Sequence, residues 1–198
     1  MGNSAVRVRA SKLQPEERKQ RLISAAVDVF ALKGIGTTKH VDVAKAAGVA
    51  PPTVFSYFPS RDDLIREVLD EVGKYLVQSV VDTAPQERDL QERLYQSGLK
   101  SIAMASERPN YMRVWLMWGT QFVPELQAQY RHYESQILDI FCEMIRSGSA
   151  SDDPEEDIHD RARMILGSST YLQKMIFEGV SKERLETFVR HIVTFADV

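Results

Sequence analysis

The sequence predicts an all-α protein of nine helices, and three observations support this fold class. Apolar residues recur at intervals of three and four along most of the chain, which is the period of an amphipathic helix. Long alternating apolar and polar runs do not occur, and neither do the Asn-Gly and Asp-Gly pairs that favour hairpins. Prolines and glycines divide the chain into segments of helical length.

The first helix is predicted to begin at Pro15, because proline suits a first helical position and the acids Glu16 and Glu17 suit the helix dipole. Gly34 ends it. Two short helices follow, over about residues 40–47 and 51–58, with Gly48 between them.

Six further helices are predicted after these three. The run Ser60-Arg61-Asp62-Asp63 resembles a capping box and opens a long helix that reaches about residue 80. The next helix covers about residues 87–106, a further one begins at Pro109, and another covers about residues 124–146. The last two are a helix that ends at Gly179 and a helix that Ser181 caps. We therefore expect a flexible basic arm over 1–14, a unit of three helices over 15–60 and a helical domain over 61–198.

Composition excludes several classes of protein. The chain has 198 residues, a mass of 22.5 kDa and 43% hydrophobic residues, which is typical of a globular protein. No apolar run approaches the length of a membrane span, and no secretory signal is expected. The single cysteine, Cys142, rules out an intrachain disulfide and favours a reducing, cytoplasmic location.

Charge is distributed unevenly along the chain. Residues 1–66 carry 11 Lys and Arg against six Asp and Glu, whereas the remainder carries 14 against 22. A basic N-terminal third on an acidic body indicates that one end meets a polyanion. Charge alone does not distinguish this from a chance scatter of solvated side chains.

The pattern of short helix, glycine and short helix is typical of a helix-turn-helix. Ala44 and Ala47 are small enough for two helices to approach closely, and Gly48 suits the left-handed conformation of a sharp turn. Val54 and Phe58 are placed to fill the small core between the helices. The N-terminal end of the second helix is the end that touches bases in such motifs.

The stretch from Arg18 to Leu69 resembles the DNA-binding region of TetR-family transcription regulators. The match rests on many positions at fixed spacing over about 50 residues. The matching runs are Ala25 to Phe30, Lys33-Gly34, Asp42-Val43-Ala44, Ala47-Gly48-Val49, Thr53-Val54-Phe55, Tyr57-Phe58 and Arg61-Asp62-Asp63-Leu64.

Within that family the chain is similar to the LuxR/HapR/SmcR subgroup, the quorum-sensing master regulators of vibrios. The run Thr53-Val54-Phe55-Ser56-Tyr57-Phe58-Pro59-Ser60-Arg61 carries this likeness, together with Val114-Trp115 and Trp118 further along. Pro51-Pro52 departs from the more polar pair that is usual in the family. This departure leaves the operator sequence open.

The resemblance implies a homodimer that binds a pseudo-palindromic DNA operator. Arg7 and Arg9 are expected either to enter a minor groove or to belong to a disordered, solvated tail. Pro51 and Pro52 are expected to touch thymine methyl groups. Phosphate or positioning roles are expected for Lys39, Thr53, Ser56 and Tyr57, and also for Lys45. His40 is expected either to touch the DNA backbone or to be a surface residue at the start of its helix.

The resemblance also implies a small apolar or amphipathic effector among the helices of the second domain and dimerisation through the last two helices. The aromatic pocket candidates also fit ordinary core, and the interface stripes also fit the subunit's own core. The pocket candidates are Tyr75, Leu76, Trp115, Trp118, Tyr130, Glu134 and Tyr171. The interface candidates are Ile165, Ser169, Leu172, Ile176, Leu185, Phe188, Val189 and Ile192.

Two other functional classes remain as alternatives. An enzyme is disfavoured because the sequence has no metalloprotease, phosphate-loop or nucleophile-elbow motif, so no metal or cofactor is expected. The acidic segment 152–160 is expected to cap a helix, and Cys142 to be a core residue. A helical scaffold would not need the basic arm or the reading helix. The sequence does not distinguish a repressor from an activator.

Overall fold

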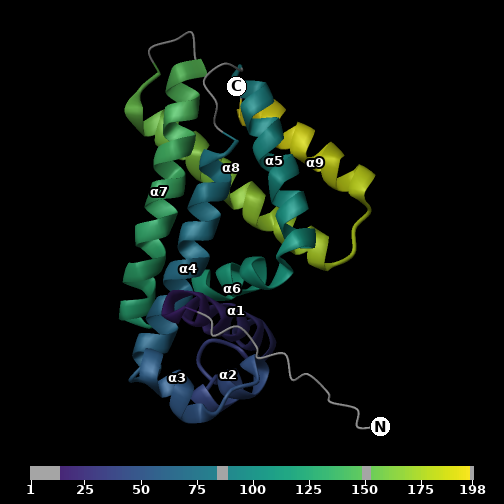
Figure 1. Cartoon of the computed structure of the whole chain (residues 1–198). Helices are drawn as coiled ribbons and strands as arrows, with labels where there is room; N and C mark the ends of the chain where they lie inside the picture. Colours follow the sequence, from purple (N-terminus) through teal and green to yellow (C-terminus); the bar gives the residue numbers. More distant parts are fainter. Residues whose placement is uncertain (1–13, 84–88, 149–152, 197–198) are drawn as a thin grey trace.

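The computed structural model describes residues 14–83, 89–148 and 153–196, and these form nine helices with no strand (Figure 1). The predicted all-α class and the order of the helices are confirmed. The predicted start of the fifth helix at 87 lies outside the described residues, as do Arg7 and Arg9. The helices are α1 (Pro15–Lys33), α2 (His40–Ala47), α3 (Pro51–Tyr57), α4 (Arg61–Val81), α5 (Leu90–Glu107), α6 (Pro109–Gly119), α7 (Pro124–Gly148), α8 (Glu155–Phe177) and α9 (Lys182–Ala196).

A small lobe at one end of the molecule contains α1, α2, α3 and the start of α4 (Figure 1). Phe30, Val54, Phe58 and Leu64 are fully buried at its centre. Gly48 ends α2 with a φ of 67°, a left-handed conformation that glycine adopts without strain. The chain can therefore turn sharply between α2 and α3.

The start of α4 is fixed by a capping box, as the sequence predicts. The Ser60 hydroxyl accepts from the Asp63 amide at 3.0 Å, and the Asp63 carboxylate accepts from the Ser60 amide at 3.1 Å. Hydrogen bonds from Ser60, followed by one from Arg66, lower the pKa of the Asp63 carboxyl. The ionised carboxylate is thus the form that holds the first turn.

Arg61 ties the connection between α1 and α2 to this first turn of α4. Its Nε donates to the Thr38 carbonyl at 3.0 Å, and its Nη2 donates to the carbonyls of Ile35 and Gly36. Arg61 therefore links the connection that precedes the helix-turn-helix to the N-terminal end of α4.

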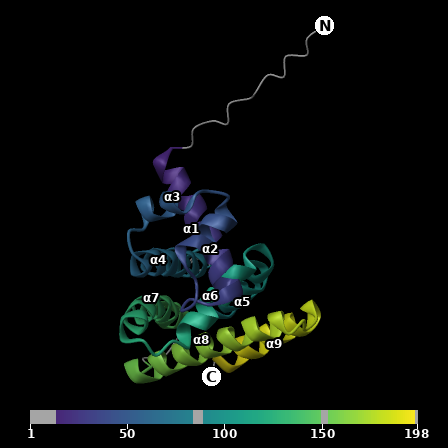
Figure 2. The ribbon, with the colours of Figure 1, turned by 90° about the horizontal axis from the view of Figure 1, so that it is seen from below.

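In the body of the molecule the remainder of α4 packs against α6 and α7, and α5, α8 and α9 pack on one another beside them (Figure 1). Trp118, Met144, Ile145 and Leu172 are among its fully buried side chains. Helices α8 and α9 lie side by side and form the outer layer on one side of the body (Figure 2). Among the described residues, no helix is both long and apolar enough to cross a membrane.

The lobe and the body share one continuous core, and α4 runs through both. Gly73 on α4 lies against the Tyr133 ring of α7, because a Cβ at Gly73 would stand only 2.3 Å from Tyr133 Cδ2. The Tyr133 hydroxyl donates to Asp70 on the same face of α4. Tyr133 therefore joins α7 to the helix that carries the lobe.

Candidate DNA-reading surface and effector cavity

Helix α3 presents one side to the lobe's core and the other to solvent. Val54 is fully buried on the inner side, whereas Pro51, Pro52 and Ser56 are exposed on the outer side. Thr53 and Tyr57 are half-buried along the flanks. The outer side lies at the end of the lobe that is farthest from the body (Figure 1), so it is free to meet a flat or grooved partner.

His40 does not lie where either sequence-based alternative placed it. The side chain is only 5% exposed, so it is neither a surface residue nor available to a DNA backbone. Its Nε2 donates to the Phe58 carbonyl at 2.8 Å. The imidazole therefore links the start of α2 to the end of α3, a role that sequence spacing did not reveal because the two residues are 18 positions apart.

Two exposed apolar side chains, one on α3 and one on α2, were missed as candidate DNA contacts. Phe55 is 47% exposed and Val41 is 52% exposed. The Phe55 ring stacks on the His40 ring with centroids 4.1 Å apart and planes 2° apart. The signal was available in the sequence, because Phe55 follows Pro51 by four residues, about one helical turn, and so shares the side of α3 that carries the exposed Pro51.

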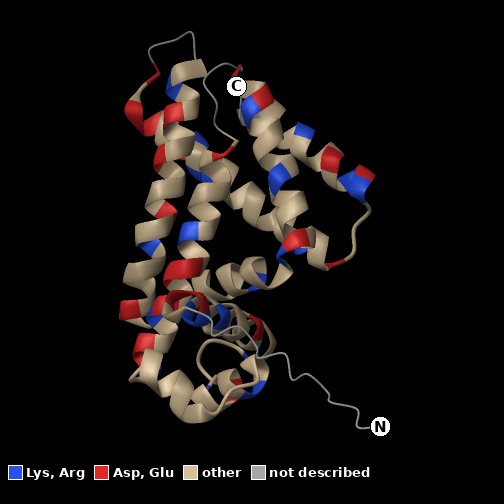
Figure 3. Cartoon of the chain, viewed as in Figure 1, with Lys and Arg blue, Asp and Glu red and all other residues tan. Residues whose placement is uncertain are grey.

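The predicted basic contacts surround α3 but do not lie on it. Lys39 and Lys45 are exposed at opposite ends of α2, while α3 itself carries no charged residue (Figure 3). Lys33 pairs with Asp42, whose pKa is lowered first by that hydrogen bond and then by the Lys39 backbone amide. The electrostatic contribution to DNA binding would therefore come from the edges of the lobe.

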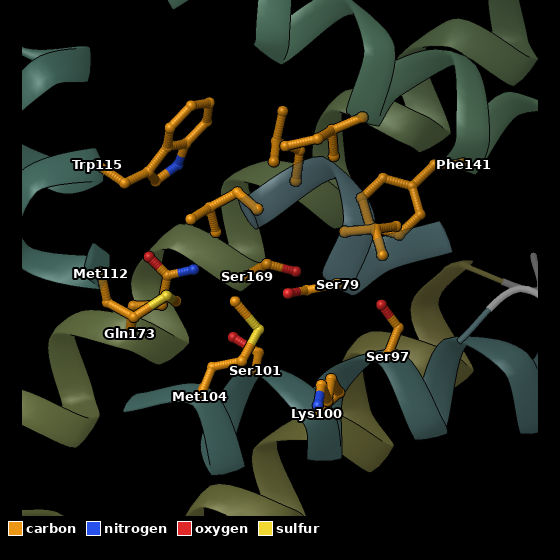
Figure 4. A pocket seen from close by; sticks show the side chains of 14 residues that line it. Ser79, Ser97, Lys100, Ser101, Met104, Met112, Trp115, Phe141, Ser169 and Gln173 are labelled. Atoms are coloured by element: carbon orange, nitrogen blue, oxygen red, sulfur yellow. The ribbon is translucent and has the colours of Figure 1, made fainter. Parts of the chain in front are cut away.

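A small cavity of about 40 Å³ lies in the body among α4, α5, α6, α7 and α8 (Figure 4). Two of the predicted pocket residues, Leu76 and Trp115, line it. Ser169, predicted at the dimer interface, lines the cavity as well. The remaining lining residues are Ser79, Val80, Ser97, Lys100, Ser101, Met104, Met112, Ile137, Phe141, Leu166 and Gln173.

Within the part of the chain that the structure describes, two polar atoms in the cavity wall have no hydrogen-bond partner. Gln173 is 6% exposed, and its Oε1 has no partner among the residues that the structure describes. The same holds within the described ranges for the Ser101 hydroxyl. A buried acceptor without a partner lowers the free energy of unfolding by about 1–3 kcal/mol. A bound molecule that donates a hydrogen bond to Gln173 Oε1 would remove this cost.

Five predicted pocket residues lie away from this cavity. Trp118 is fully buried, and its Nε1 donates to the Leu126 carbonyl at 2.8 Å. Tyr130 packs on Trp118 and Trp115, and burial, followed by the charge of Glu134, raises the pKa of its phenol. These residues build the contact between α6 and α7.

The other two aromatic candidates are peripheral. Tyr75 packs edge-to-face on Tyr111 with centroids 4.9 Å apart, and Arg108 lies over both rings. Tyr171 is 56% exposed on the outer surface of α8. Neither side chain lines this cavity, because helical spacing does not say which side of a helix meets it.

Half of the predicted interface residues are packed inside the subunit. Ile165, Leu172, Leu185 and Val189 are at most 4% exposed in the single chain, so they are not on a surface that a second copy could contact. The sequence left this alternative open. Ile176, Phe188 and Ile192 are half-buried.

Cys142 is a core residue, as the sequence predicts. It is 1% exposed, and burial raises the pKa of its thiol. The His159 ring lies 3.6 Å from its sulfur, and Glu155 pairs with the same ring. A buried thiol with a raised pKa is a poor nucleophile, so this Cys-His-Glu group does not resemble an activated triad.

Comparisons with known proteins agree on one family. Residues 22–68 match the family model described as bacterial regulatory proteins of the tetR family. The chain is 30% identical over 151 residues to the HTH-type transcriptional regulator LuxR of Vibrio harveyi, and the match covers 74% of each chain.

Solved structures agree in fold. A TetR-like transcriptional regulator from Rhodococcus sp. RHA1 superposes with a TM-score of 0.77 at 15% identity, covering 92% of this chain and 96% of that one. FadR from Bacillus subtilis in complex with stearoyl-CoA superposes with a TM-score of 0.73 at 21% identity, covering 90% and 97%.

A helix-turn-helix lobe on a helical body defines a DNA-binding transcription regulator. The chain belongs to the tetR family of bacterial regulatory proteins. Its relatives and fold neighbours are transcriptional regulators and not enzymes.

Proposed function

We propose that this regulator binds a pseudo-palindromic operator as a homodimer, in the manner of the quorum-sensing regulators that the LuxR likeness suggests. Each copy places the outer side of α3 in a major groove, with the two α3 helices about 34–36 Å apart. The observation that carries the proposal is the exposed outer side of α3 on a lobe whose turn is set by Gly48. Lys39 and Lys45 supply phosphate contacts, and binding takes place in the cytoplasm.

The outward side of α8 and α9 supports the dimer. Met164 and Tyr171 are 41% and 56% exposed and stand seven residues apart on α8. Phe188 on α9 reaches the same region, with its ring centroid 6.1 Å from that of Tyr171. The two helices form an outer layer (Figure 2), so two copies can meet there about a twofold axis. The exposed Tyr171, and not the buried Leu172, is the interface residue in this proposal.

The cavity supports control by a small amphipathic effector. Ligand pockets usually enclose about 300–1,000 Å³, so a cavity of about 40 Å³ must widen to accept one. Met104 and Met112 in its wall adapt easily to a new shape. Helix α4 contributes Leu76 and Ser79 to the same wall, and its N-terminal end belongs to the small lobe that contains α3. Widening therefore changes the spacing of the two α3 helices.

A salt-titrated selection tests the DNA-binding part of this proposal. The purified chain is mixed with a random duplex pool at several salt concentrations, and bound duplexes are sequenced. We expect a pseudo-palindrome, with an affinity that falls steeply as salt rises. Tyr57→Ala should weaken binding to selected and random duplexes alike. A folded protein that enriches no sequence at any salt concentration would contradict the proposal.

A further inference from the structure

The outward side of α3 offers few hydrogen bonds to a base pair. The helix contains no Lys, Arg, Asn, Gln, Asp or Glu, the side chains that recognise guanine, adenine and cytosine edges in a major groove. Its hydroxyl side chains are Thr53, Ser56 and Tyr57. The Ser56 hydroxyl already donates to the Thr53 carbonyl at 2.7 Å.

The first three residues of α3 add no free backbone donor. Pro51 and Pro52 have no N–H group, and the Thr53 amide donates to the Ala50 carbonyl at 2.9 Å. The end of the helix that enters the groove therefore cannot read bases through backbone amides.

This end of the lobe offers apolar surface instead. Pro51 and Pro52 are exposed, and Phe55 is 47% exposed beside them. Stacking on His40 fixes one face of the Phe55 ring, and the bond from His40 to the Phe58 carbonyl holds the imidazole. The exposed part of the ring is thus held in one orientation before any partner arrives, which lowers the entropy cost of binding.

We propose that α3 discriminates bases through thymine methyl groups, with Pro52 and Phe55 as the residues that determine specificity. The inference rests on the proposed operator binding. The C5-methyl of thymine is the apolar group that a base edge presents in the major groove, and cytosine lacks it. Each half-site then carries thymine at one or two positions opposite α3.

Removing single methyl groups from the selected operator tests this inference. Each thymine of the half-site is replaced in turn by deoxyuridine, symmetrically in both halves, so that base pairing is kept and only the methyl group is lost. Burial of one such group is worth about fourfold in affinity, so loss from both half-sites should weaken binding about 15-fold. The measurement is the dissociation constant at fixed salt.

Variants of α3 assign the methyl contact to particular side chains. Some deoxyuridine substitutions should weaken binding by the unaltered protein. At those positions, Pro52→Ala and Phe55→Ala should each bind the thymine operator and the deoxyuridine operator with equal affinity. Pro52 is exposed to solvent, so the folded lobe should persist in Pro52→Ala even if Phe55→Ala loosens it. Lys39→Ala is the matched control, because loss of a phosphate contact weakens both operators by the same factor.

The outcomes separate this inference from the proposed function. An enriched operator at which every deoxyuridine substitution leaves the affinity unchanged would overturn methyl reading and leave the proposed function intact. Sensitivity that persists in both α3 variants would overturn the assignment to Pro52 and Phe55. Failure to enrich any operator would overturn the proposed function, and methyl reading with it.

Discussion

The outer side of α3, the proposed reading surface, and the cavity differ in whether their polar groups have hydrogen-bond partners. On α3 the Ser56 hydroxyl is satisfied within the lobe, and beneath it His40 donates to the Phe58 carbonyl, while apolar Phe55 faces solvent. In the cavity, whose wall mixes apolar side chains with serines and Lys100, Gln173 Oε1 has no partner among the described residues. The reading surface thus suits a partner that brings methyl groups, whereas the cavity suits one that brings a hydrogen-bond donor.

The largest effect is expected from enlarging the cavity. Trp115→Ala should lower the free energy of unfolding by about 3–5 kcal/mol, because it removes a large side chain that is 2% exposed. Part of this loss should return on adding indole, which can fill the space. Thermal unfolding with and without indole is the measurement.

Trp118→Ala is the matched control for this prediction. Trp118 is fully buried but does not line the cavity, so its variant should be equally destabilised and respond less to indole. An equal response of the two variants would show that the cavity is not a preferred site for a small aromatic molecule.

Removing the unpaired amide should stabilise the protein. Gln173→Leu should raise the free energy of unfolding by about 1–3 kcal/mol, because it replaces an unsatisfied buried acceptor by an apolar group of similar shape. Gln96→Leu is the control, since the Gln96 amide donates to Glu92 at 2.8 Å. Urea unfolding measures both. A Gln173→Leu protein that is less stable than the unaltered chain would mean that this amide is satisfied in solution.

Loss of the buried histidine should loosen the reading surface. His40→Leu leaves the Phe58 carbonyl without its donor and should cost about 1–2 kcal/mol. DNA affinity should fall as well, because the Phe55 ring loses the imidazole on which it stacks. Val41→Ala, at an exposed neighbour, should change stability by less than about 0.5 kcal/mol. Equal DNA affinity and stability of His40→Leu and the unaltered chain would contradict the role given to His40.

The smallest effect concerns pH. The pKa of Asp63 is lowered in the folded state, so its contribution to stability is present above the ordinary Asp pKa of about 3.9 and is lost as pH falls through the folded value. Asp63→Asn should therefore melt below the unaltered chain at pH 7, and the gap should narrow in acid. Asp62→Asn, at an exposed position in the same turn, is the control. A difference in melting temperature that stays constant with pH would contradict a stabilising role for the ionised Asp63 carboxylate.

Local signals predicted the lobe better than the body. Pro15, Gly48 and Ser60 fix helix ends through backbone chemistry within a few residues, so their roles were predictable from sequence. His40 was misplaced because its partner, Phe58, is distant in the chain. Its environment depends on how α2 and α3 pack, which periodicity does not encode.

The cavity was harder to predict because it depends on how five helices meet. Aromatic spacing pointed to Trp118 and Tyr130, which instead build the contact between α6 and α7. Gln173 carried the more useful signal, a polar residue on the otherwise apolar stripe of α8 beside the buried Leu172. Serines from α4, α5 and α8 converge on the same space only in three dimensions (Figure 4).

The dependence of affinity on the spacing of operator half-sites tests the central claim most directly. The selected operator is compared with versions that carry five extra base pairs between the half-sites or lack one half-site altogether. A homodimer with two α3 helices one helical turn apart predicts a large loss of affinity in both cases, because five base pairs turn one half-site to the opposite side of the duplex. Equal affinity for the intact operator, the lengthened operator and the single half-site would contradict the account.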